Sequence, residues 1–250
     1  MDRKRTLEDV AGLEHQKSIV HDSIILPRKR AELYDRMVKR PDMISDNNTF
    51  LFYGPSGSGK TFLAQAVANE IGIPYKETQA TQFLNEYRGE GAKKLRQMYA
   101  LEGERMFVID EIDAIAKTRS GYDNSGTYDL VLQLNMVLDG PGSARDKITI
   151  FSTNREDLID SAIMSRIPKD QKIYFPKPNE IQRYKIIEKH LEYHNHDIKD
   201  VSPLLHASED YDGRQIKYMF RSARNNALKA NRDYLTTADF NRNGRRYQVK

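Results

Sequence analysis

The sequence contains no cysteine, so disulfide bonds and thiolate metal sites are excluded, and a reducing compartment such as the cytoplasm fits this composition. It contains no run of 18 apolar residues, which excludes a membrane-spanning helix. No hydrophobic stretch follows the first residues, so no signal peptide is expected. What remains is a chain of 250 residues, 38% hydrophobic and 30% charged, a composition typical of a globular protein of one or two domains.

Acidic residues become scarce at the end of the chain. Residues 214–250 hold ten basic and two acidic side chains, whereas residues 41–213 have a net charge of −7 and the whole chain one of +4. A basic segment attached to an acidic body attracts nucleic acid or an acidic partner. It is equally typical of a solvated helix face, and the charge pattern by itself leaves both interpretations open.

Short β-type runs alternate with longer helical segments through the first two thirds of the chain. Because this alternation is typical of βαβ units, it predicts an α/β fold with a five-stranded parallel sheet flanked by helices. Ligands of such sheets bind at the carboxyl ends of the strands. The expected strands cover residues 49–53, 73–78, 106–109, 148–153 and 172–175.

A small all-helical lid domain is expected after the proline pair Pro176 and Pro178. Asn179 is a good cap for a first helix, a second is expected near Gly213, and a third from Thr236 or Thr237. The apolar face of the first helix would hold Ile181, Tyr184, Ile187 and Leu191, and that of the second Ile216, Met219, Phe220, Ala223 and Ala227.

A complete phosphate-binding motif, G-x-x-x-x-G-K-[ST], follows the first expected strand and opens a helix over residues 62–70, as that motif requires. Its glycines let backbone N–H groups turn around phosphates at the start of a helix. The motif lysine adds a charge beside the β- and γ-phosphates, and the motif hydroxyl ligates Mg²⁺. The eight residues are Gly54, Pro55, Ser56, Gly57, Ser58, Gly59, Lys60 and Thr61.

Polar residues end two later strands, beside the expected phosphates. Asp110 and Glu111 follow the apolar run at residues 106–109, and Asn154 follows the run at residues 148–153. We expect Asp110 to hold Mg²⁺ together with Thr61, and Glu111 to act as general base on the attacking water. Asn154 would orient that water or contact the γ-phosphate.

These three elements, in this order, resemble the AAA+ ATPases. Four further segments resemble those of the branch that contains FtsH, katanin and spastin, and the resemblance runs from about Leu7 to Phe240. We therefore expect a single AAA module without an N-domain or protease domain. The four segments are Leu7 to Leu13, Asp110 to Ile115, Leu138-Asp139-Gly140, and Asp160 to Ile163 followed by Arg166.

The resemblance implies a RecA-like nucleotide-binding AAA+ domain over residues 1–176 and a helical lid over residues 177–250, with ATP and Mg²⁺ between them. Arg166 would be an arginine finger completing a neighbouring subunit's site. Arg214 departs from the small residue usual in this branch; other AAA+ branches place a sensor arginine near this position, and in that role Arg214 would reach the γ-phosphate. Asp139 is implied to lie between subunits of a ring, usually of six. The remaining residues implied to bind nucleotide are Val10, Ala11, Gly12, Phe62, His190 and Gly213.

The substrate is expected to meet an aromatic pore loop. Tyr87 occupies the aromatic position in the loop that resembles the pore loops of FtsH and katanin, and Arg88 departs from the aliphatic residue often found next. The first hypothesis is therefore a ring motor that remodels or unfolds a polypeptide substrate, recruited directly or by an adaptor protein. The alternative is a nucleic-acid-associated ATPase, a replication or transposition helper, that uses the basic C-terminal face. A third is a regulatory ring subunit that threads nothing.

Overall fold

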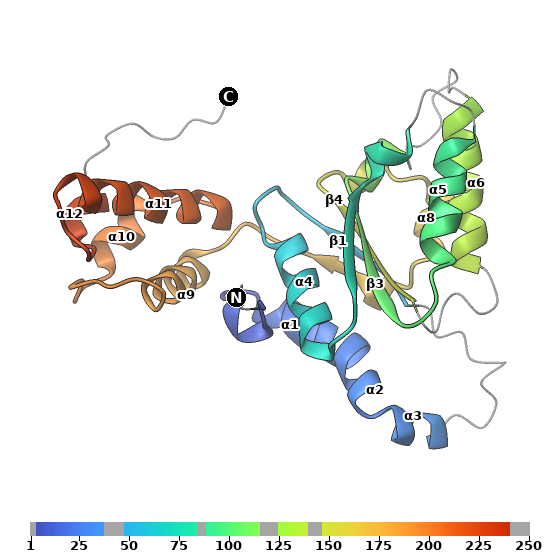
Figure 1. Ribbon diagram of the computed structural model, residues 1–250, viewed down its shortest axis with the longest axis horizontal. Helices are drawn as coiled ribbons and strands as arrows, with labels where there is room; N and C mark the ends of the chain where they lie inside the picture. The colour runs from blue at the N-terminus through green and yellow to red at the C-terminus, as the bar shows by residue number, and fades with distance from the viewer. Residues whose placement is uncertain (1–3, 38–47, 85–88, 116–124, 140–146, 241–250) are drawn as a thin grey trace. The chain divides into compact units, whose positions relative to one another are not determined.

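The computed structural model describes residues 4–37, 48–84, 89–115, 125–139 and 147–240 (Figure 1). The described residues form two compact units, each of which is described by itself. The first comprises residues 4–7, 15–54 and 60–175, and the second comprises residues 8–14, 55–59 and 176–240. The phosphate-binding motif therefore contributes to both units, with Gly54, Lys60 and Thr61 in the first and residues 55–59 in the second.

The first unit is built on a five-stranded parallel sheet with the order β2-β3-β4-β1-β5, which confirms the expected fold class. Each of the first four strands is followed by a crossover through helical structure, as parallel pairing requires. The strands are β1 (Thr49–Tyr53), β2 (Tyr75–Gln79), β3 (Arg105–Asp110), β4 (Lys147–Thr153) and β5 (Lys172–Tyr174).

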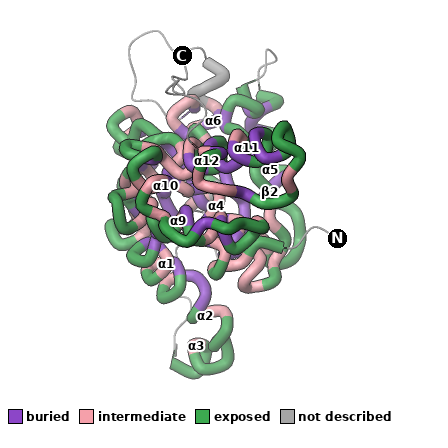
Figure 2. Tube along the Cα trace, turned by 90° about the vertical axis from the view of Figure 1, so that its left-hand side faces the viewer, coloured by how far each residue is buried: buried purple, intermediate pink, exposed green. Residues whose placement is uncertain are grey.

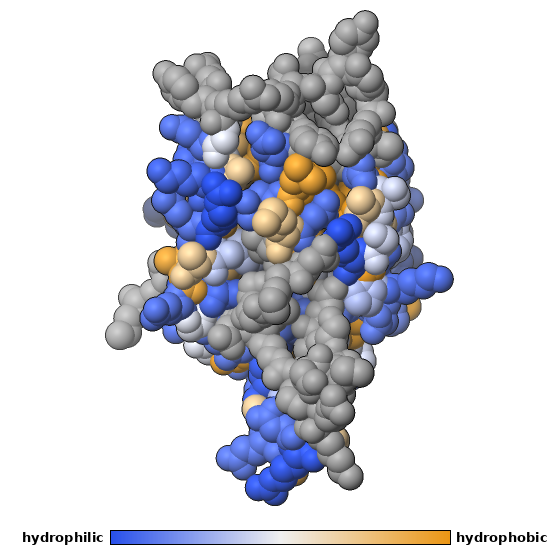
Figure 3. Space-filling view, turned by 90° about the vertical axis from the view of Figure 1, so that its right-hand side faces the viewer, coloured by the Kyte–Doolittle hydropathy of each residue, from blue (hydrophilic) through white to orange (hydrophobic). Residues whose placement is uncertain are grey.

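Helices cover both faces of the sheet in the first unit. Helix α4 (Lys60–Ile71) and α1 (Glu14–Val20) lie on one face, and α5 (Glu90–Tyr99) and α6 (Ser125–Asp139) lie on the other (Figure 1). The central strands β1 and β3 are therefore apolar on both sides: Leu51 and Phe107 pack into the core under α5 and α6, and the next residues along each strand, Phe52 and Val108, are also fully buried. Polar residues surround a small apolar area on the surface that carries α5 and α6 (Figure 3).

The helical segment before β1, residues 14–37, was not predicted from the sequence. After α1 the chain continues through a π-helical turn (His21–Ile25) into α2 (Leu26–Lys29) and α3 (Ala31–Met37). The turn buries Ile24 and Ile25, whereas α3 is exposed along almost its whole length (Figure 2). The short 3-10 or α-helical turns of the two units cover Leu7–Asp9, Ala80–Phe83, Ile112–Ala114, Glu156–Leu158, Ser161–Met164 (α8) and Lys169–Gln171.

The second unit is helical and has its own core, as expected for the C-terminal part. Asn179 and Asp212 each form a complete capping box, so both long helices begin at residues whose side chains satisfy the first free N–H groups. The predicted apolar face of the second long helix is buried. The helices are α9 (Glu180–Leu191), α10 (Ser202–Ala207), α11 (Gly213–Lys229) and α12 (Thr237–Phe240).

Three details differ from the sequence-based expectation. Strand β2 begins at Tyr75 rather than residue 73, because Pro74 has no N–H to donate to the ladder. Helix α10 was not predicted. The apolar face assigned to α9 was half wrong: Ile187 and Leu191 are buried, but Ile181 is 68% and Tyr184 40% exposed. Only the C-terminal half of α9 supplies buried residues to the core of this unit.

Candidate nucleotide-binding site

Within the first unit, the carboxyl ends of β1 and β4 are joined at the base of the phosphate-binding motif. The N–H of Gly54 donates to the carbonyl of Thr153 over 3.3 Å. The ammonium of Lys60, the first residue of α4, donates to the Gly54 carbonyl over 2.8 Å and to Asn154 Oδ1 over 2.9 Å. Lys60 is only 7% exposed. A buried cation requires oxygen acceptors, and two predicted site residues supply them.

Gly54 cannot be replaced by a residue with a side chain at this point of the motif. Its φ is +135°, and a Cβ atom there would lie 2.2 Å from the carbonyl oxygen of Phe175. L-residues avoid this region of backbone space, and the close carbonyl leaves no room for a methyl group. The sharp turn out of β1 therefore depends on glycine.

The two predicted catalytic carboxylates follow β3. Asp110 is half-buried, and its Oδ1 accepts a hydrogen bond of 3.0 Å from the N–H of Glu111. Glu111 is exposed and adopts a left-handed conformation, with φ 55° and ψ 44°. A non-glycine residue in this region stores backbone strain, and such strain is typical of functional positions.

Residues 55–59 of the motif contact the start of α11 inside the second unit. The N–H of Gly213 donates to the carbonyl of Gly57 over 3.1 Å. Gly57 has a φ of +75°, and a Cβ atom there would lie 2.4 Å from Cγ of Asp212. Asp212 was missed from the sequence, although its position three residues before Gln215 is a capping-box signal.

A nucleotide phosphate fits the chemistry that these residues offer. Ser58 is 7% exposed, and its hydroxyl has no hydrogen-bond partner among the described residues. Buried hydroxyls are ordinarily paired, so this one is available to a ligand. Lys60 supplies a cation, and Thr61 with Asp110 supplies the hard oxygen donors that Mg²⁺ prefers. ATP and Mg²⁺ therefore suit the residues present.

Most of the other predicted nucleotide contacts belong to the second unit. Val10 is buried, and Gly12 lies against Gln182, where a Cβ atom would be 3.0 Å from its carbonyl oxygen. Ala11 lies between them in the chain, and Arg214 is an exposed residue in the first turn of α11. The structure thus brings Val10, Ala11, Gly12, residues 55–59, His190, Gly213 and Arg214 into one unit.

His190 is partly buried and packs against aromatic rings. Its ring stacks on Phe220 with centroids 4.8 Å apart and an interplanar angle of 22°, and the ring of His194 contacts the same phenyl group at 5.4 Å. Burial lowers the pKa of His190 to about 4, and the nearby His194, Lys217 and Arg224 lower it in the same direction. His190 is therefore a neutral ring at physiological pH.

Phe62 has a partner that the sequence did not reveal. The guanidinium of Arg5 lies 5.2 Å from the centroid of the Phe62 ring, and it donates to Gln65 Oε1 over 2.6 Å. The side-chain amide of Asn69 in turn donates to the Arg5 carbonyl over 2.9 Å. The N-terminal segment is thereby held along α4, the helix that begins at Lys60.

The residues predicted to act between subunits are only partly described. Arg166 is partly exposed, follows α8, and donates to the Ala162 carbonyl over 2.7 Å. Asp139 is the last residue of α6. The predicted pore-loop residues Tyr87 and Arg88 lie outside the described residues.

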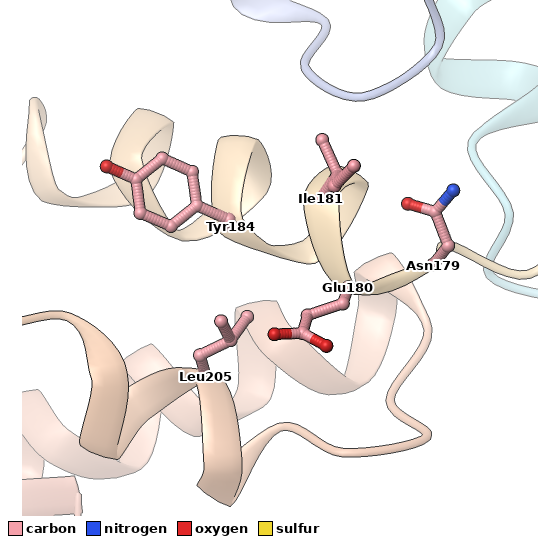
Figure 4. Close-up of a pocket in the computed structure, with 5 residues that line it drawn as sticks. All are labelled: Asn179, Glu180, Ile181, Tyr184 and Leu205. Carbon is pink, nitrogen blue, oxygen red and sulfur yellow. The ribbon is translucent and has the colours of Figure 1, made fainter.

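In the parts of the chain that the structure describes, no cluster of three or more His, Asp or Glu side chains is arranged to hold a metal ion. Likewise, none of the described helices is both long enough and apolar enough to cross a membrane. A hollow of about 620 Å³ in the second unit, lined by Asn179, Glu180, Ile181, Tyr184 and Leu205, contains no predicted site residue (Figure 4).

The parallel sheet, the phosphate-binding motif and the polar strand ends define a P-loop ATPase fold. Residues 50–176 match the family model described as "ATPase family associated with various cellular activities (AAA)". This match covers half of the chain, and the protein belongs to the AAA family.

Relatives of this chain have names that refer to the proteasome. It is 32% identical over 243 residues to the 26S proteasome regulatory subunit 6A of Encephalitozoon cuniculi, covering 94% of this chain and 59% of that protein. It is 33% identical over 240 residues to the proteasome-activating nucleotidase of Methanothermobacter thermautotrophicus, covering 93% and 57%. The chain therefore spans under three fifths of the length of these relatives, and the narrower resemblance to FtsH, katanin and spastin stays a prediction.

Proposed function

We propose that this chain binds and hydrolyses ATP with Mg²⁺, and that a homo-oligomeric ring of it, of six subunits, remodels or unfolds polypeptide. The observation that carries the proposal is the buried ammonium of Lys60, held by Gly54 and Asn154 at the carboxyl ends of β1 and β4. Family membership and the proteasome-linked names of the relatives support it.

Each site residue has a chemical role in this proposal. Lys60 neutralises phosphate charge, and the backbone of residues 54–59 with the Ser58 hydroxyl binds phosphate oxygens. Thr61 and Asp110 would hold Mg²⁺, which when bound polarises the phosphoryl group. Glu111, exposed at the end of β3, takes a proton from the attacking water. Asn154 orients that water, since its amide nitrogen is not engaged by the Lys60 contact.

The finer assignments concern the ring. Arg166 would act in trans on a neighbouring site, where an arginine finger contributes about 10³–10⁵ in kcat. Asp139 would lie at the same subunit boundary, and Tyr87 with Arg88 would contact an extended polypeptide. The narrower assignment to the branch of FtsH, katanin and spastin is also part of this proposal. The roles given to Arg166, Asp139, Tyr87 and Arg88 rest on resemblance to that branch.

The test measures hydrolysis and unfolding together. Purified protein with ATP and Mg²⁺ should release phosphate and unfold a fluorescent protein that carries an unstructured tail. Glu111→Gln should bind ATP but hydrolyse it at least about 100-fold more slowly, because the general base is lost. Glu102→Gln, another exposed carboxylate, located before β3, is the matched control and should retain both activities.

The outcomes separate the two candidate functions. Hydrolysis at the wild-type rate by Glu111→Gln would show that another residue is the general base. Hydrolysis without unfolding, stimulated by DNA or RNA in a salt-sensitive manner, would favour the nucleic-acid alternative instead. The named relatives give that alternative no support, so we expect polypeptide rather than nucleic acid to stimulate turnover.

A further inference from the structure

The strand ends that carry Glu111 and Asn154 are joined by a side-chain hydrogen bond between residues outside the set predicted from the sequence. The hydroxyl of Thr153, the last residue of β4, donates to Asp113 Oδ1 over 2.7 Å. Asp113 belongs to the 3-10 turn Ile112–Ala114, which directly follows Glu111. Strands β3 and β4 are neighbours in the sheet, with Ile109 opposite Phe151, so this bond links two adjacent strand ends.

The Thr153 hydroxyl is both a hydrogen-bond donor and a hydrogen-bond acceptor. It also accepts a hydrogen bond of 2.9 Å from the N–H of Arg155, and Thr153 is only 1% exposed. The carbonyl of Thr153 accepts from Gly54. The backbone is thus fixed immediately before and immediately after Asn154, and the Asn154 side chain is left to contact Lys60.

The carboxylate turn is fixed by bonds of its own. The left-handed Glu111 is followed by a tight turn in which the N–H of Ala114 donates to the Glu111 carbonyl over 2.9 Å. Ile112, between Glu111 and Asp113, is completely buried and anchors the turn in the core. The backbone turn therefore links the position of Asp113 to that of Glu111, two residues earlier.

We propose that Asp113 is a positioning residue for ATP hydrolysis, acting through the Thr153 hydroxyl to hold Asn154 in register with Glu111. This inference rests on the proposed ATPase function and deepens it. Asp113 accepts a hydrogen bond from the Thr153 hydroxyl and is not proposed to contact a reacting atom. Its effect falls on the chemical step, because Lys60 and the phosphate-binding motif remain to bind the nucleotide when the link is removed.

The experiment removes each partner of the Thr153–Asp113 hydrogen bond in turn. Thr153→Val removes the hydroxyl at nearly constant volume, and Asp113→Ala removes its acceptor. Each should lower kcat about 10- to 100-fold, the cost of misplacing a reacting group by about 1 Å. The Kd for ATP should stay within about threefold. Thr153→Ser and Asp113→Asn keep a donor and an acceptor respectively, and should restore most of the lost rate.

Thr149→Val is the matched control on β4. Thr149 is 3% exposed, and its hydroxyl is paired with that of Tyr99 over 2.8 Å, away from the strand end. This control should hydrolyse ATP at the wild-type rate even though it also loses a buried hydroxyl. Melting temperatures of all variants identify any that fails to fold, and Asp113→Ala, which alters a partly exposed turn, then decides the matter.

A double-mutant cycle separates positioning from general loss of stability. If Asp113 acts through Asn154, then Asp113→Ala should cost nothing further in an Asn154→Ala background. Additive losses, a wild-type rate in folded Thr153→Val, or a loss of ATP affinity as large as the loss of rate would overturn the inference. Absence of hydrolysis by the wild-type protein would instead reject the proposed function itself.

Discussion

Lys60 and Asn154 meet through a hydrogen bond of 2.9 Å, although they come from a helix start and a strand end that are far apart in the sequence. The lysine belongs to the phosphate-binding motif, and the asparagine was predicted to contact the γ-phosphate. Their contact means that the cation and the predicted γ-phosphate contact already share one small region within the first unit. Any phosphate that binds Lys60 therefore approaches Asn154 as well.

Replacement of Lys60 by alanine should abolish tight ATP binding. The variant loses a buried ammonium whose charge-assisted hydrogen bonds contribute about 1.5–3 kcal/mol each, so affinity should fall at least about 10- to 100-fold. Isothermal titration with ATP and Mg²⁺ measures the change. Lys76→Ala, which removes an exposed lysine of β2, is the control. Undiminished affinity in Lys60→Ala would reject the assignment of the phosphate-binding motif.

Gly57→Ala should disturb both the motif and the start of α11. The new methyl group would meet the Asp212 carboxylate, which caps α11. Gly72→Ala is a matched control, because Gly72 has nearly the same φ, +74°, and no atom within 4 Å of the position of its Cβ. Since both variants carry the same backbone strain, the additional loss of stability in Gly57→Ala, about 1–2 kcal/mol, reports the steric conflict alone.

Thermal unfolding and ATP titration of the two glycine variants decide this point. We expect Gly57→Ala to bind ATP more weakly than Gly72→Ala. Equal stability and equal affinity would show that Asp212 moves aside without cost.

Asp239→Ala should destabilise the second unit strongly. The carboxylate is almost completely buried and accepts bonds from both terminal nitrogens of Arg232, over 2.9 Å and 2.6 Å, and from Thr236. The Arg232 pairing holds the pKa of Asp239 at about 2. Removing one member of a buried pair typically costs about 3–5 kcal/mol. Asp233→Ala, an exposed acid in the segment between α11 and α12, should change the free energy of unfolding by less than about 0.5 kcal/mol.

Stability should depend on His190 between pH 6.5 and about 4. Its pKa is lowered in the folded state, so below pH 6.5 the unfolded chain binds a proton that the folded chain does not bind until about pH 4. Stability is lost as the pH falls through this window. One pKa unit corresponds to about 1.4 kcal/mol, and partial exposure reduces the full effect to about 1–3 kcal/mol.

Urea denaturation at a series of pH values tests the His190 prediction. His190→Gln should flatten the decline between pH 6.5 and 4, whereas His206→Gln, an exposed histidine of the same unit, should follow the wild type. Parallel declines for the wild type and His190→Gln would contradict it.

The sequence predicts those parts of the molecule that depend on local pattern. The apolar run Thr49–Tyr53 ends at Gly54, so both bounds of β1 could be predicted, and the motif that follows places Lys60 at a helix start. The alternation of strands and helices is also a local pattern, and it predicts the parallel sheet. Chemistry at strand ends follows from the fold class, since parallel strands end at one edge.

Long-range contacts are not encoded in any local pattern. The Asp113–Thr153 bond depends on the register between β3 and β4, and the contact of Gly57 with Asp212 joins distant parts of the chain. Periodicity placed Ile181 and Tyr184 on the apolar face of α9, but both side chains are exposed, because only packing determines how much of that face is covered. The stacking of His190 on Phe220 is likewise a tertiary contact.

At Glu111 the left-handed backbone conformation lowers stability, whereas the proposed catalytic role requires a carboxylate side chain. L-residues with a side chain lose roughly 1–2 kcal/mol in this conformation, whereas glycine adopts it freely. Selection for thermal stability alone would therefore favour glycine here, and selection for turnover would retain the carboxylate. In a library randomised at this codon, the two selections should enrich different residues at position 111. That difference measures the trade-off between stability and catalysis at this position.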